Sequence, residues 1–236
     1  MSTLLLQFKA PMQSWGISAK FDTRYTDQVP SKSAVIGMIA GALGRRRNES
    51  VDDLNVVRFG VRVDCSGKMF DDFQTVQSYK DSLKRITFDN PTISQRKYLA
   101  DAAFLVGLEG DAELLKSIEY ALKHPFYPIF LGRRSCPPEG RLVLGIRDAS
   151  LLEALKAEPW IAEDKERGDK VRFVLDALPD EEESYILRDN AVSFDQNCRR
   201  FGFRRIRDIR EDVECKSDNV VDREPDTEHD PMSDLL

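Results

Sequence analysis

The stretch that decides the fold covers residues 102–146 and reads AAFLVGLEGDAELLKSIEYALKHPFYPIFLGRRSCPPEGRLVLGI. It begins with an apolar run typical of a buried strand, and Asp111 then opens a segment in which leucines and isoleucine recur at helical spacing up to Pro125. Another apolar run, residues 142–146, ends the stretch. The pattern therefore predicts a strand, a helix, a loop and a second strand, in that order.

The loop of this stretch places a glycine beside two arginines, in the sequence FLGRRSCPP at residues 130–138. Gly132 has no Cβ, so its backbone can come close to a ligand. The guanidinium groups of Arg133 and Arg134 are planar forks of donors that fit a phosphate in bidentate geometry. The loop therefore indicates a polyanion site, although on these residues alone a solvated turn explains it equally well.

The residues before this stretch give the first half of the same arrangement. An apolar run at residues 3–8 predicts a buried strand, residues 30–43 carry the clearest helix start, and residues 56–63 alternate as a strand does. The order is strand, helix, strand, insertion, strand, helix, glycine loop, strand, which is the βαββαβ arrangement of ferredoxin-like and RRM domains. We therefore predict an α+β fold with an RRM-like domain at residues 1–147.

Three further regions complete the chain. Residues 66–99 show no sustained period, and we expect a long, thumb-like insertion, since insertions of that length are usually functional or disordered. Residues 148–210 contain short apolar runs that predict a small C-terminal β-rich unit. Residues 211–236 have almost no apolar periodicity, so we expect an acidic, disordered tail.

Charge is distributed unevenly along the chain. The formal net charge is −6, but ten acidic and two basic residues lie in residues 211–236, which leaves residues 1–210 with a net charge of +2. An arginine stripe precedes the acidic tail and is interleaved with phenylalanines and isoleucines; its members are Arg199, Arg200, Arg204, Arg205, Arg207 and Arg210. The stripe predicts either an element that covers the core while its charges stay in water, or a contact with RNA or a partner.

Composition excludes several classes of protein. With 236 residues, 41% of them hydrophobic, the chain is long enough to bury a substantial core. No run is apolar and long enough to span a bilayer, and residues 1–8 lack the features of a signal peptide, so we expect a cytoplasmic protein. The four cysteines form no C-x-x-C pair and there are two histidines, so we expect free thiols and no metal or other cofactor.

Two features near the N-terminus allow more than one interpretation. Trp15, beside Gly16 in an irregular segment, is either a plug at the edge of the core, which is the commoner case, or a stacking face for a base. The predicted helix N-terminus carries Lys32 and the hydroxyls of Ser31 and Ser33. It is either an anion site or an ordinary cap.

Four blocks of sequence, in this order along the chain, together resemble one family. They are PMQSWG at residues 11–16, PSKS at residues 30–33, YLADAAF at residues 98–104 and YPIFLGRRSCP at residues 127–137. The combination resembles the CasD family, the subunit of the type I-E CRISPR surveillance complex Cascade that binds the 5′ handle of the guide crRNA. A looser similarity continues at residues 192–195 and in the arginines that follow.

The resemblance implies an RNA-binding domain whose insertion packs against the Cascade backbone subunit and kinks the RNA. It also implies a cap at one end of the complex, next to the Cascade large subunit, and hence an indirect link to target DNA in antiviral defence, with no membrane partner. The acidic tail departs from the strongly basic pattern of the family. The RNA-binding residues that the resemblance implies are Gln13, Trp15, Gly16, Arg24, Lys32, Ser33, Gly132, Arg133, Arg134 and Ser135.

Catalysis is an alternative, because some relatives of this superfamily cut their own repeat RNA without a metal. A metal-independent endoribonuclease needs a base, an acid and a cation at the reacting phosphate. His124, Lys123 and Tyr127, with the two loop arginines, form such a set on paper. However, the first two fall in the last turn of a predicted helix, where the dipole favours cations without any chemistry. Because the resemblance also assigns cutting to a separate subunit, we expect no enzyme activity.

A stand-alone RNA-binding domain is the third interpretation. The insertion argues against it, because it carries several apolar residues that a free domain would expose to water. These residues are Phe70, Phe73, Tyr79, Leu83 and Ile86. We therefore expect a protein partner at the insertion.

Overall fold

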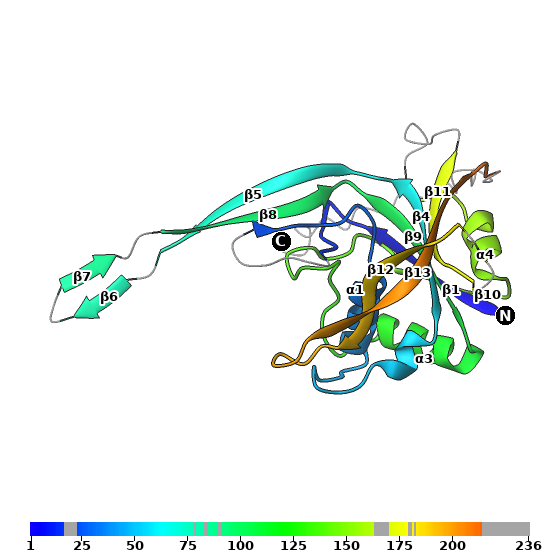
Figure 1. Cartoon of the computed structure of the whole chain (residues 1–236), viewed down its shortest axis with the longest axis horizontal. Coiled ribbons are helices and arrows are strands. Elements are labelled where there is room, and N and C mark those ends of the chain that lie inside the picture. The colour runs from blue at the N-terminus through cyan, green and yellow to red at the C-terminus, as the bar shows by residue number, and fades with distance from the viewer. Residues whose placement is uncertain are drawn as a thin grey trace, which may run out of the picture.

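The computed structural model describes residues 1–16, 23–77, 79–82, 85–88, 91–162, 170–178, 181 and 183–213 (Figure 1). Among these residues, no helix is both long and apolar enough to cross a membrane.

The predicted βαββαβ order is confirmed in the first part of the chain. Four strands pair in the order β10-β1-β9-β4, and every neighbouring pair is antiparallel. Helices α1 and α3 connect them as expected, and the short helix α2 precedes β4. The bounds are β1 Ser2–Lys9, α1 Lys32–Ala42, α2 Asp52–Asn55, β4 Arg58–Cys65, β9 Ala103–Gly110, α3 Ala112–Lys123 and β10 Val143–Arg147.

The C-terminal strands, which the sequence predicted as a small β-rich unit, extend this same sheet. They are β11 Val171–Asp176, β12 Tyr185–Ser193 and β13 Arg200–Glu211. Strand β11 pairs with β4, β13 pairs with β11, and β12 forms the edge of a seven-stranded sheet. The physical reason is that β4 would otherwise present a row of unpaired backbone groups, and β11 satisfies them.

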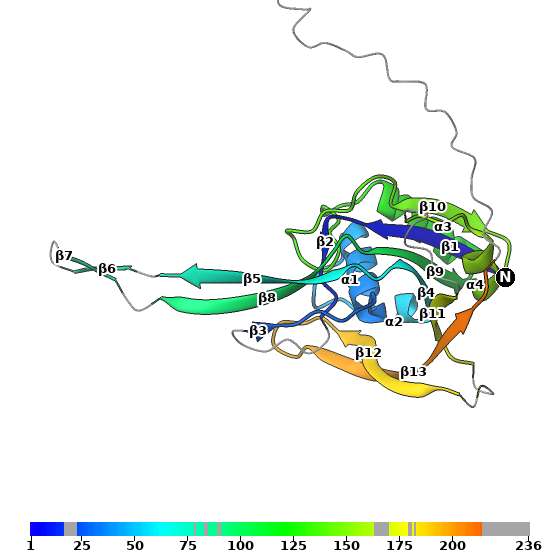
Figure 2. The ribbon, with the colours of Figure 1, turned by 90° about the horizontal axis from the view of Figure 1, so that it is seen from above.

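The insertion is a regular β-ribbon, whereas its sequence predicted no regular structure. Strands β5 (Lys68–Val76) and β8 (Thr92–Ala100) pair over nine residues, and β6 (Tyr79–Ser82) pairs with β7 (Arg85–Phe88) beyond them. The ribbon projects far from the sheet in both views (Figures 1 and 2). Most residues of β5 are exposed, so neither face imposes the alternation of apolar and polar residues that marks a half-buried strand. Two short strands, β2 (Met12–Gln13) and β3 (Thr23–Arg24), also pair with β8.

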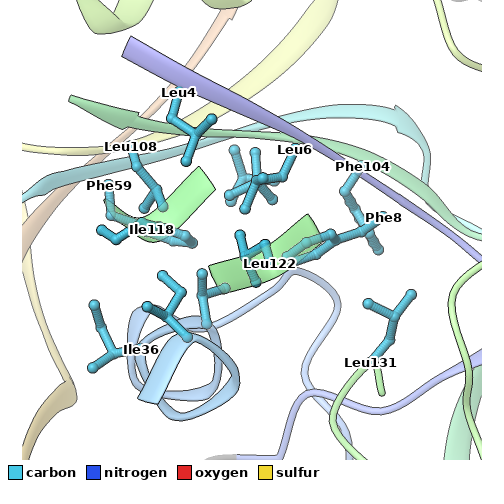
Figure 3. Close-up of a cluster of buried hydrophobic side chains, with 14 of the residues drawn as sticks. Leu4, Leu6, Phe8, Ile36, Phe59, Phe104, Leu108, Ile118, Leu122 and Leu131 are labelled. Carbon is cyan, nitrogen blue, oxygen red and sulfur yellow. The ribbon is translucent and has the colours of Figure 1, made fainter. Parts of the chain in front are cut away.

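Helices cover both faces of the central strands. On one face, side chains of β1, β4 and β9 pack against Ile36 of α1 and Ile118 and Leu122 of α3 (Figure 3). On the other face lies α4 (Leu151–Ala157), whose Leu151 and Leu155 pack over two glycines that face each other on neighbouring strands. Gly60 and Gly107 are these glycines, and a Cβ on the latter would lie 2.7 Å from Leu151 Cδ1. The sheet face that an RRM leaves open for stacked bases is therefore covered here.

This second layer also accounts for a buried arginine in β4. Arg62 is completely buried in β4 and forms two 2.7 Å hydrogen bonds to the carboxylate of Asp64. Its guanidinium also donates to the carbonyls of Leu155, Glu158 and Pro159, at the end of α4. This charge is therefore used to hold α4 on the sheet.

Candidate nucleic-acid interface

The glycine loop is fixed against the segment that follows β2. Gly132 has φ +86°, and a Cβ at this position would lie 1.6 Å from the carbonyl oxygen of Ser14. The neighbouring Leu131 accepts a hydrogen bond from the Ser14 N–H at 3.2 Å and donates one to the Cys136 carbonyl at 2.7 Å. The glycine therefore permits a close approach of two segments of this protein, and that approach positions the arginines after it.

Arg133 is held in place by two contacts. Its Cζ lies 4.5 Å from the ring centroid of Tyr98 in β8, and its Nη2 donates a 3.1 Å hydrogen bond to the carbonyl of Arg24 in β3. Its Nη1 is buried and has no hydrogen-bond partner within the part of the chain that the structure describes. Arg134 and Ser135, which follow it, are exposed. This loop thus presents one guanidinium group that is held in place, on Arg133, and one that is exposed, on Arg134.

Tyr98 brings a third arginine to the same place. Burial of Tyr98 disfavours the phenolate, but hydrogen bonds from Ser135, Arg133 and Arg96, together with the charge of Arg133, outweigh burial and lower the pKa of Tyr98 below its usual value. Arg96 and Tyr98 are two residues apart on β8 and therefore share one face of the strand. Arg24 lies beside Arg96 in the parallel register of β3 and β8.

We call Arg24, Arg96, Arg133 and Arg134, together with Tyr98, the arginine cluster. Its members come from β3, β8 and the glycine loop, and no carboxylate among the described residues forms an ion pair with any of its arginines. Asp72, opposite Arg96 in the ribbon, instead accepts a hydrogen bond from Gln74. A concentration of unpaired guanidinium groups of this kind can bind a polyanion such as an RNA backbone.

The sequence identified three of these arginines but missed Arg96 and Tyr98 as site residues. Both lie in the insertion, where no period was visible, although their i, i+2 spacing is the signal that places two side chains on one face of a strand.

Gln13 and Trp15 lie in the core rather than at the surface. Trp15 is 1% exposed and stacks on Phe8 with ring centroids 5.3 Å apart. Its Nε1 donates to Gln13 Oε1 at 3.2 Å, and Gln13 Nε2 donates to the Ala102 carbonyl at 2.7 Å. The structure therefore favours the plug over the stacking face, and Gly16, the next residue, is the exposed one.

Lys32 and Ser33 are also buried, so the helix N-terminus acts as a packed cap. Lys32 Nζ forms an ion pair with Asp176 at 2.9 Å and donates to the Val57 carbonyl at 2.7 Å. The N-cap residue is Ser31, but its side chain caps nothing; Asp189 of β12 accepts a 3.0 Å hydrogen bond from the Lys32 N–H instead. This cation is neutralised inside the protein.

Much of the arginine stripe is likewise engaged within the protein. Arg204 lies between Asp176 and Asp189, and Arg207 pairs with Glu181. Arg205 donates to Ser184 Oγ, and Arg199 lies against Phe194 and Phe201. The stripe lies on strand β13 except for Arg199, which precedes it, and Arg204 is buried rather than keeping its charge in water.

The residues considered for catalysis each contact another residue of the protein, at the end of α3 or just after it. His124 Nδ1 lies 3.2 Å from the carbonyl of Tyr120, and Lys123 Nζ forms a 2.7 Å ion pair with Glu119. Tyr127 packs edge-on against Phe126. Cys136, buried in the glycine loop, has a thiol pKa raised by burial and remains protonated. Within the described ranges, no three metal-ligating side chains cluster.

Comparison with known proteins gives the family. The family described as "CRISPR-associated protein (Cas_Cas5)" matches residues 3–207. The CRISPR system Cascade subunit CasD of Escherichia coli (strain K12) is 32% identical over 163 residues, which cover 63% of this chain and 73% of that protein. A chain of a solved CRISPR RNA-guided surveillance complex superposes with a TM-score of 0.76 at 32% identity, covering 89% of this chain and 90% of that chain. A second solved structure, titled "Crystal structure of Cas protein", gives a TM-score of 0.70 at 37% identity, covering 90% and 96%. The chain therefore belongs to the Cas5 family of CRISPR-associated proteins, with CasD among its homologues.

Proposed function

We propose that the chain is a non-catalytic subunit of a type I-E CRISPR Cascade complex that binds the 5′ handle of crRNA and caps the backbone filament in antiviral defence. The observation that carries this proposal is the arginine cluster, in which four guanidinium groups from three segments have no carboxylate partner among the described residues. The similarity to CasD and to a chain of a surveillance complex supports the same assignment.

The proposed RNA contacts fall into two groups. Gly16, Arg24, Gly132, Arg134 and Ser135 are exposed, and Arg133 lies half-buried among them. These are the positions at which phosphates and sugars of a single strand can be reached. The other members of the expected set are buried and support this surface from the core; they are Gln13, Trp15, Lys32 and Ser33.

The ribbon is the proposed contact with the backbone subunit. Several large apolar side chains along it are about half exposed or more, which is unfavourable unless a partner covers them. They are Met69, Phe70, Phe73, Val76 and Ile93. The proposal further places the Cascade large subunit beside this chain, with an indirect contact to target DNA, in the cytoplasm.

The test is the affinity of the purified full chain for a labelled crRNA 5′ handle across a range of salt concentrations. The double variant Arg133→Ala/Arg134→Ala should bind more weakly, and the slope of log affinity against log salt should fall by about 1.4, because two phosphate contacts to a single strand are lost. The matched control is Arg46→Ala/Arg47→Ala, which removes two adjacent, exposed arginines outside the cluster. Equal salt slopes for the cluster variant and the parent would refute the proposal.

The endoribonuclease alternative is tested by incubating the protein with the same labelled RNA in EDTA and analysing the RNA on a denaturing gel. The handle-binding proposal expects intact RNA that is nevertheless retarded on a native gel. A single cleavage product that disappears in His124→Ala would make the protein an endoribonuclease instead.

A further inference from the structure

Two arginine nitrogens of the cluster lack an acceptor in a place where water does not reach them. Arg96 Nε and Arg133 Nη1 are both buried, and neither has a hydrogen-bond partner among the described residues. A buried donor without a partner is costly, and more so when it carries charge, so such groups are rare in folded proteins. Two of them on neighbouring side chains indicate that an acceptor belonging to a ligand is missing.

The geometry makes the two nitrogens parts of one site. Arg133 lies over the Tyr98 ring at 4.5 Å, and Arg96 lies on the same strand face as Tyr98. Both guanidinium groups and the Ser135 hydroxyl interact with the Tyr98 side chain. Two positive charges therefore share one tyrosine hydroxyl, and no described carboxylate forms an ion pair with either of them.

We propose that Arg96, Tyr98, Arg133 and Ser135 form a binding site for one phosphodiester group of the single-stranded guide, an inference that rests on the proposed function. A phosphate supplies both the charge and the several acceptor oxygens that two guanidinium forks require. A base edge supplies acceptors without the charge. Tyr98 is a positioning residue, whose ring supports Arg133 and whose hydroxyl keeps both arginines at one point.

Binding at this site includes a local rearrangement of side chains. The two unpartnered nitrogens are covered, whereas Arg134 and Ser135 at the rim are exposed. A phosphate therefore meets the exposed groups first and reaches the covered donors after a rotamer change, a common event at interfaces. The bond from Arg133 Nη2 to the Arg24 carbonyl anchors that side chain meanwhile.

The test combines protein variants with RNA that lacks one charge. Handle RNAs carrying a single uncharged methylphosphonate on a 2′-deoxy sugar are scanned along the handle, with the 2′-deoxy sugar alone as the reference. With the parent protein, one linkage should show a loss of affinity of about tenfold, because charge-assisted hydrogen bonds to that phosphate are removed. With Arg96→Gln, overall affinity should be lower and the loss at that one linkage should be clearly smaller than with the parent, because Arg133 and Ser135 still contact the phosphate.

Lys97→Gln is the matched control, because it removes the neighbouring charge from the opposite face of β8, where Lys97 pairs with Asp71. It should leave the loss at every linkage unchanged. Tyr98→Phe keeps the ring and removes the hydroxyl, so it should reduce the loss at the same linkage, and it supplies the test if Arg96→Gln does not fold.

The outcomes separate this inference from the proposed function. If Arg96→Gln retains the loss at every linkage while the handle is still bound, the site is refuted and the proposed function stands. If the variant binds RNA as the parent does but fails to join the other subunits, the missing acceptor is a carboxylate of a protein partner. If the parent protein does not bind the handle, the proposed function itself fails.

Discussion

Gly132 and Gly140 both have positive φ, but only at Gly132 does the backbone of another segment lie where a side chain would be. A Cβ at Gly132 would lie 1.6 Å from the Ser14 carbonyl oxygen, whereas at Gly140 the nearest atom is the Gln7 amide nitrogen at 4.0 Å. We expect Gly132→Ala to lower the free energy of unfolding by about 3 kcal/mol through strain and displacement of the loop. Gly140→Ala should cost about 1 kcal/mol, from its φ alone.

Urea unfolding of the two variants measures this difference. Gly132→Ala should also weaken handle binding, since the loop carries Arg133 onto Tyr98. Equal stabilities for the two variants would mean that contact with Ser14 does not fix the loop.

Residue types alone could indicate the glycine loop but not which polar residues are buried. The sequence grouped Lys32 with the loop arginines, yet it pairs with Asp176, a residue far along the chain. Trp15 beside a glycine gives no signal of Phe8 beneath it. Such partners depend on long-range packing, which no local pattern contains.

At the scale of elements, the edge hairpin of β12 and β13 is attached to the body by a buried charge network. Arg204 contacts Asp176 and Asp189, and Asp189 also accepts from the first N–H of α1. Burial opposes the charge of Arg204, but the hydrogen bond and charge of Asp189, with Asp176, outweigh it and raise the pKa of Arg204 above its usual value. The guanidinium therefore stays charged while buried.

We expect Arg204→Ala to lower the free energy of unfolding by about 3–5 kcal/mol, because the buried carboxylate of Asp189 loses its ion pair and the partly buried Asp176 keeps Lys32 as its cation among the described residues. Arg207→Ala on the same strand removes a more exposed pair with Glu181 and should cost less than about 1 kcal/mol. Chemical denaturation followed by circular dichroism gives both values. Similar losses for the two variants would contradict the anchoring role of the network.

The ribbon shows which strands can be predicted from the sequence and which cannot. Strands β1 and β9 were predictable because each contains a run of buried apolar residues, whereas β5 and β8 have exposed residues on both faces. Their pairing rests on backbone hydrogen bonds, which leave no trace in a pattern of apolar residues.

For the whole molecule, the seven-stranded sheet limits where the proposed RNA contact can lie. Helix α4 covers the face of the central strands that an RRM would offer to bases, and the C-terminal strands close the edge beside β4. The sequence predicted the βαββαβ order, since each of its elements carries its own local signal. It could not predict that β11 pairs with β4, because that pairing joins distant segments. The arginine cluster, between the ribbon and the glycine loop, lies outside this covered face.

Net charge gives the last prediction, because residues 214–236 contain eight acidic and two basic residues and leave residues 1–213 with a net charge of zero. A net charge of −6 on this segment repels RNA from the whole protein at low salt. We expect its deletion to increase RNA affinity at low salt and to steepen the salt dependence, with the two proteins converging once the Debye length falls below about 10 Å, above 0.1 M. Gel-shift titrations across salt concentrations measure this. A full-length control with a shuffled order of residues 214–236 should behave as the parent does, because its charge is unchanged. Unchanged affinity of the truncated protein at low salt would show that this segment does not screen the arginines.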